Sequence, residues 1–89
     1  MKINIPEWAW FHFWEEPPPD AMEFWAFRFK PPCRRGDELL FHYEGKVVAR
    51  AVVHKIEPPG VSECAATAKF KHRWKVFWTQ ESFEDLRHG

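Results

Sequence analysis

Runs of apolar and aromatic residues, separated by short segments containing Pro, Gly and Asp, divide the chain into five candidate strands. The apolar runs are rich in β-branched and aromatic residues, which favour extended structure. The segments between them contain the residues that are typical of turns and loops. We therefore predict strands at 8–15, 22–30, 38–43, 46–57 and 69–78.

Two local patterns refine this prediction. Glu44 and Gly45 separate the third and fourth runs, which predicts a tight hairpin. In residues 79–87 the pattern changes, because Thr79 can cap a helix, acidic residues follow it and Arg87 ends the segment. The expected fold is mainly β (α+β): a small five-stranded curved sheet or pseudo-barrel with a short C-terminal helix.

Length and composition limit the class of protein. A chain of 89 residues forms one small domain, here residues 1–89, and a large multi-domain enzyme is excluded. Six Trp, nine Phe and one Tyr are unusually many for this length. The 13 basic and 13 acidic residues cancel, yet residues 28–75 carry eleven basic and five acidic residues. The net charge of the chain is therefore zero, although its middle segment is basic.

The fifth predicted strand carries the strongest charge pattern. Because side chains alternate along a strand, Lys69, Lys71, Arg73 and Lys75 are expected on one face. Such a row is either a solvated outer face above a buried aromatic one or a stripe that follows nucleic-acid phosphates. Further cations come from the preceding loop and are candidate members of the stripe: Arg28, Lys30, Arg34 and Arg35.

The first two predicted strands are apolar on both faces. A sheet with one solvent-exposed face needs apolar residues on only one face. Barrel closure would bury these rings; the alternatives are a base-stacking pocket and a dimer surface. For a base-binding pocket, the candidate stacking residues are Trp8, Trp10 and Trp25.

The cysteines and histidines show no metal-ligating spacing. Cys33 and Cys64 are expected to be free thiols in a reducing compartment. Ser62 and Ser82 lack the context of a catalytic nucleophile. We predict no cofactor, no metal site and no catalytic residue. The N-terminus has no signal-peptide pattern and no run approaches about 18 apolar residues, so we expect a cytoplasmic protein without a membrane partner.

Four sequence segments, RGDELLFH at 35–42, GKVVARAVV at 45–53, IEPP at 56–59 and RWKVFW at 73–78, resemble the PUA-like superfamily, particularly its EVE and ASCH branches. The resemblance covers roughly residues 22–79. It agrees with the local chemistry, since Gly36 permits a tight turn and Asp37 can accept hydrogen bonds from neighbouring backbone amides.

The resemblance implies a small pseudo-barrel whose pocket holds a nucleobase, often modified, flipped out of RNA or DNA. Some ASCH relatives hydrolyse acetylated cytidine with a Lys, a Thr and a Glu, but the entry motif that carries their Lys–Thr pair is absent here. The sequence therefore predicts a non-catalytic domain that recognises RNA or a modified base. The alternatives are an interaction module that uses the surplus aromatic residues, including a homodimer, and a small amidohydrolase acting on an acetylated nucleoside.

Overall fold

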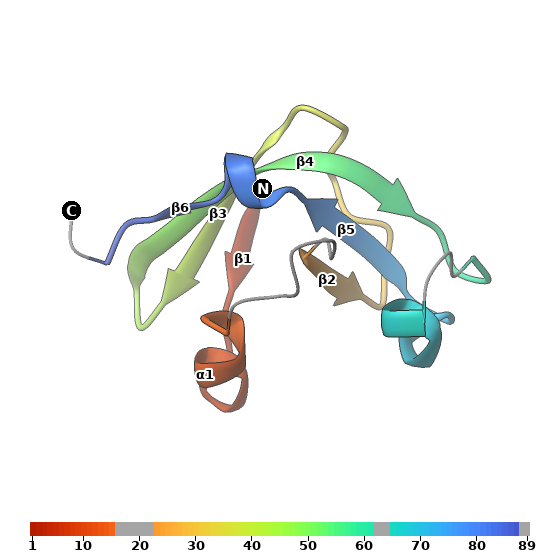
Figure 1. Ribbon diagram of the computed structural model, residues 1–89, viewed down its shortest axis with the longest axis horizontal. Helices are drawn as coiled ribbons and strands as arrows, with labels where there is room; N and C mark the ends of the chain where they lie inside the picture. The colour runs from red at the N-terminus through yellow and green to blue at the C-terminus, as the bar shows by residue number, and fades with distance from the viewer. Residues whose placement is uncertain (16–22, 62–64, 88–89) are drawn as a thin grey trace.

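A single curled sheet of six strands forms the framework of the computed structural model, which describes residues 1–15, 23–61 and 65–87 (Figure 1). The strands are β1 (Lys2–Asn4), β2 (Glu23–Phe27), β3 (Glu38–Tyr43), β4 (Lys46–Glu57), β5 (Trp74–Trp78) and β6 (Glu84–Asp85). Their order is β1-β3-β4-β5-β2, and β6 pairs with β4. The β1–β3 pair is parallel and the others are antiparallel. The expectation of a mainly β fold built on a small curved sheet is confirmed.

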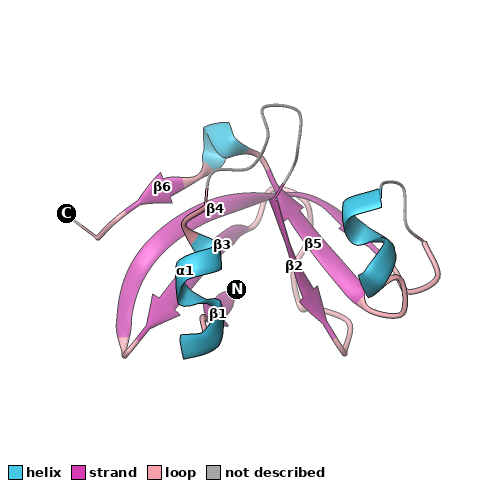
Figure 2. Ribbon diagram, turned by 60° about the horizontal axis from the view of Figure 1, so that its bottom comes forward, coloured by secondary structure: helices cyan, strands magenta, loops and turns pink. Residues whose placement is uncertain are grey.

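The long strand β4 gives the sheet its curvature. Its first half pairs with β3, its last residues pair with β5, and the register shifts between Val53 and Lys55. A β-bulge at such a point bends and twists the strand. In Figures 1 and 2, β4 arches over the two halves of the sheet. The result is a half-barrel, in which β1 and β2 are the edge strands on either side of an opening.

Both turns singled out in the sequence have the expected conformation. Glu44 and Gly45 have φ angles of 51° and 80°, as a two-residue hairpin turn with positive φ requires. Gly36 has a φ of 94°, and the Asp37 carboxylate accepts a 2.7 Å hydrogen bond from the Arg34 backbone N–H. The two strands joined by the hairpin have the predicted bounds, 38–43 and 46–57.

Most of the buried apolar side chains form one cluster that spans both halves of the sheet. Phe41 on β3 is fully buried, and its ring lies 4.9 Å from the ring of Trp78 on β5. It also lies 4.8 Å from the ring of Phe13, which enters from the N-terminal segment. The buried members are Ile3, Ile5, Ala9, Leu39, Phe41, Val48, Ala49, Ala51, Val53, Val76 and Trp78.

The predicted strand at 8–15 is wrong. This segment forms a 3₁₀ helix, η1 (Glu7–Ala9), followed by one turn of α-helix, α1 (Trp10–Phe13). Because nearly every residue in it is apolar, the run satisfies a helical period as well as a strand period. Trp10, Phe13 and Trp14, at helical spacing, pack on the core, whereas Trp8 and Phe11 remain exposed. The sequence did not predict the short strand β1 before it.

The predictions for the last third of the chain hold only in part. Strand β5 begins at Trp74 rather than 69, because residues 65–70 form a 3₁₀ helix, η2 (Ala65–Phe70), followed by a turn. Thr79 does act as a cap and accepts a hydrogen bond from the Ser82 N–H. The helix it begins is one 3₁₀ turn, η3 (Gln80–Ser82), followed by β6, so the predicted C-terminal helix is wrong.

Several predictions lie outside the described residues, namely those on Met22, Ser62 and Cys64. Cys33 is a free, half-buried thiol whose pKa is raised chiefly by burial and also by Asp37. Among residues 1–15, 23–61 and 65–87, no three His, Cys, Asp or Glu side chains gather as a metal site would require. No helix in that part of the chain is long and apolar enough to cross a membrane.

Candidate functional site

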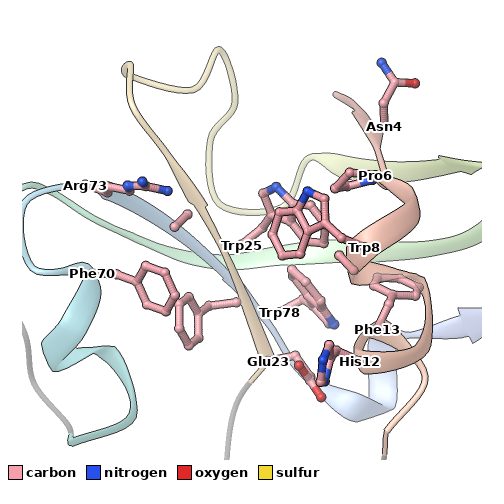
Figure 3. Close-up of a pocket in the computed structure, with 13 residues that line it drawn as sticks. Asn4, Pro6, Trp8, His12, Phe13, Glu23, Trp25, Phe70, Arg73 and Trp78 are labelled. Carbon is pink, nitrogen blue, oxygen red and sulfur yellow. The ribbon is translucent and has the colours of Figure 1, made fainter.

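A pocket of about 490 Å³ lies at the opening of the half-barrel (Figure 3). One wall comes from β1, η1 and α1, and the other from β2, with Phe70 and Arg73 beyond it. Because β2 is an edge strand, side chains from both of its faces reach the pocket. The lining residues are Asn4, Pro6, Trp8, Ala9, His12, Phe13, Glu23, Phe24, Trp25, Ala26, Phe70, Arg73 and Trp78.

Two of the three tryptophans proposed from the sequence line this pocket. Trp8 is 80% exposed, although its neighbour along the segment, Ala9, is buried. Trp25 is half-buried and lies 6.3 Å from the Phe13 ring, so the core holds it in place. Trp10 is not a lining residue, because it stacks on Tyr43 with a ring separation of 3.9 Å and packs against the core. Trp10 therefore lies outside this pocket.

One end of the pocket is cationic. Arg73 is a lining residue and directly precedes Trp74, which pairs with Phe27 at the end of β2. Arg28 follows Phe27 and is exposed, and the Lys30 ammonium lies 5.9 Å from the centre of the Trp74 ring. Within the described parts of the chain, no acidic side chain forms a salt bridge with Arg28, Lys30 or Arg73. These three cations are therefore available to an anionic ligand.

The other end of the pocket carries a carboxylate. Glu23 begins β2 opposite Trp78, and His12 from α1 lies at the same end (Figure 3). Burial raises the pKa of Glu23. No hydrogen bond or ion pair joins its carboxylate to another described side chain, whereas His12 contacts Glu15 at 3.4 Å. The sequence prediction included neither Glu23 nor His12.

The predicted basic stripe does not exist as one face of a strand, and Lys75 is not available to phosphates. Its side chain is 0% exposed, because η2 and the following turn cover this face of β5. The ammonium donates to the carbonyls of Val61, Phe70 and Arg73 at 2.9, 3.2 and 3.1 Å. It also lies 3.4 Å from a carboxylate oxygen of the buried Glu57. Lys75 therefore holds Val61 and the turn at 70–73 on the sheet.

The other predicted cations occupy different places. Lys69 lies on η2 and Lys71 in the turn after it, and both are exposed. Arg34 and Arg35 are also exposed, but their turn is attached near the bend of β4, where the Gly36 N–H donates to the Val53 carbonyl. Val53 pairs with Trp78, at the far end of β5 from Arg73. The structure therefore separates Arg34 and Arg35 from the cationic end of the pocket.

Comparison with known proteins finds no matching family model, no similar curated protein and no similar solved structure.

Proposed function

We propose that this protein binds nucleic acid non-catalytically and holds one base of RNA or DNA in the pocket. The observation that carries the proposal is Trp8, a large ring that is 80% exposed at a pocket otherwise lined by half-buried and buried aromatic side chains. Leaving an indole in water forgoes its burial on folding, so such a ring is better explained by a ligand that covers it. A flat, unpaired base is the nucleic-acid group that stacks on aromatic side chains.

The charge distribution supports a nucleotide rather than an uncharged aromatic ligand. Arg73 lines one end of the pocket, and Arg28 and Lys30 follow the end of β2 that pairs beside it, so a backbone phosphate at this end would be attracted to all three. Glu23 and His12 lie at the other end, where polar groups of a base could be recognised. The resemblance to PUA-like domains points to the same class of ligand, and a modified base remains part of the proposal.

Trp8→Ala should weaken the binding of short single-stranded RNA or DNA by about 1 to 3 kcal/mol, because one stacking platform is lost. Phe11→Ala is a matched control, since Phe11 is also 80% exposed on the same segment but does not line the pocket. Trp fluorescence and anisotropy titrations at low salt measure both variants. Equal affinities for Trp8→Ala and the unmodified protein would contradict the proposal.

Arg73→Ala should lower affinity for all sequences alike and make binding less dependent on salt. Each phosphate contact that is lost reduces the slope of log K against log [salt] by about 0.7 for a single strand. Arg35→Ala serves as the control, because Arg35 is exposed but does not line the pocket. A salt slope that falls equally in both variants would show that the cations act only through overall charge.

A second candidate function, a protein interaction surface, is supported by Phe11 and by the edge of β2. Phe11 is exposed without lining the pocket, and β2 pairs with β5 only, within the described part of the sheet. Exposed edges and aromatic rings are typical of association sites. Light scattering at high concentration distinguishes this function, because a homodimer doubles the mass and Phe11→Ala should reduce the association.

A further inference from the structure

Glu23 is the unexplained polar group of the pocket. It begins the edge strand β2, where alternation places it on the same face as Trp25. The residue that pairs with it on β5 is the buried Trp78. A carboxylate that is partly removed from water among aromatic rings, with no described partner, costs free energy. Such residues cluster at binding and catalytic sites, where a ligand supplies the missing partner.

The chemistry of that partner follows from the acceptor character of the carboxylate. An ionised carboxylate has two oxygens that accept hydrogen bonds and no donor. Within the proposed function, on which this step rests, the base edge that meets Glu23 must therefore present N–H groups. Guanine presents two adjacent donors, N1–H and the N2 amino group, whereas adenine and cytosine each place an acceptor nitrogen beside one amino group.

We propose that the pocket selects guanine, with both donors of its Watson–Crick edge bound by the Glu23 carboxylate. The ring stacks on Trp8, and the backbone phosphate lies toward Arg73. Strand β2 separates the two ends of the pocket by roughly 13 Å, the rise of four residues, so one nucleotide unit can be oriented by opposite charges at its two ends. His12, at the Glu23 end, is suitably placed to donate a ring N–H to the O6 acceptor.

The test compares single-stranded oligouridine octamers that carry one central guanosine, adenosine or inosine. Inosine keeps N1–H but lacks the N2 amino group. The unmodified protein should bind the guanosine strand at least about fivefold more tightly than the adenosine strand, with inosine between them. Glu23→Gln should abolish this preference, because the amide both donates and accepts and matches adenine equally well. Glu81→Gln, on an exposed residue of η3, should leave it unchanged.

The outcomes separate this inference from the proposed function. If no octamer binds, the proposed function fails and guanine selection fails with it. If all three strands bind equally and Trp8→Ala weakens each of them, base binding stands and guanine selection is overturned. A guanosine preference that survives in a folded Glu23→Gln protein also overturns it. The inosine comparison needs no substitution, so the inference is testable even if Glu23→Gln does not fold.

Discussion

Replacing Lys75 by methionine is expected to lower the free energy of unfolding by about 3 to 5 kcal/mol. The loss has two sources. Among the described residues, the buried carboxylate of Glu57 then has only Lys55 as a cationic neighbour, and the Lys55 ammonium lies 3.9 Å away and is partly exposed. The carbonyls of Val61, Phe70 and Arg73 lose a charged donor. Against a total stability of about 5 to 15 kcal/mol for a small domain, this is a large fraction.

Urea denaturation followed by Trp fluorescence measures this effect, and Lys71→Met is the matched control. Lys71 is exposed and close in sequence, so its replacement should change stability by no more than about 0.5 kcal/mol. Adding Glu57→Gln to Lys75→Met should recover part of the loss, because no unpaired charge then remains buried. Equal unfolding midpoints for Lys75→Met and Lys71→Met would contradict the anchoring role assigned to Lys75.

The case of Lys75 shows what an alternating pattern can and cannot predict. Alternation correctly placed Trp74, Val76 and Trp78 on one face of the strand, and Val76 and Trp78 are buried. It also places Lys75 on the opposite face, which alternation alone predicts to be open to water or phosphate. Sequence spacing carries no information on whether a later segment covers that face. Here η2 covers it, and the carbonyls that bind the ammonium come from that covering segment and its flanking residues.

Where local chemistry is decisive, the sequence predicted the fold closely. The hairpin requires Glu44 and Gly45 to adopt positive φ, and a Gly in a two-residue turn between two apolar runs is a recognisable sequence signal for this conformation. The segment 8–15 carries no such signal, because a run of aromatic residues has no polar positions to reveal its period. Only the folded structure shows the helical spacing, through the rings of this segment that pack on the core. Which rings can pack there depends on the shape of the concave side of the sheet.

The pocket was predictable in part for the same reasons. The first two predicted strands carry more aromatic rings than one core face requires, and the half-barrel brings two of these rings, Trp8 and Trp25, to one opening. Glu23 does carry a sequence signal, because it is an acidic residue in an otherwise apolar strand. Its place opposite Trp78, in a pocket that His12 also lines, requires β2, β5 and α1 to meet in space.

Phe41→Ala is expected to destabilise the protein by about 3 to 5 kcal/mol and to weaken ligand binding as well. The Phe41 ring is fully buried, so its removal leaves a cavity that the sheet can only partly close. It lies within 6.5 Å of the rings of Trp25 and Phe13, which line the pocket, although Phe41 itself does not. Loss of this support should let both lining rings shift.

Two measurements on Phe41→Ala separate stability from support of the pocket. Urea denaturation gives the loss of stability, with Phe29→Ala as the control because Phe29 is 61% exposed. Nucleic-acid titration at low temperature, where the variant is still folded, gives the effect on binding. If Phe41 supports the pocket, affinity falls in Phe41→Ala and is unchanged in Phe29→Ala. Full affinity in the folded Phe41→Ala protein would mean that Trp25 and Phe13 are held by their other contacts, and that the pocket is independent of the core beneath it.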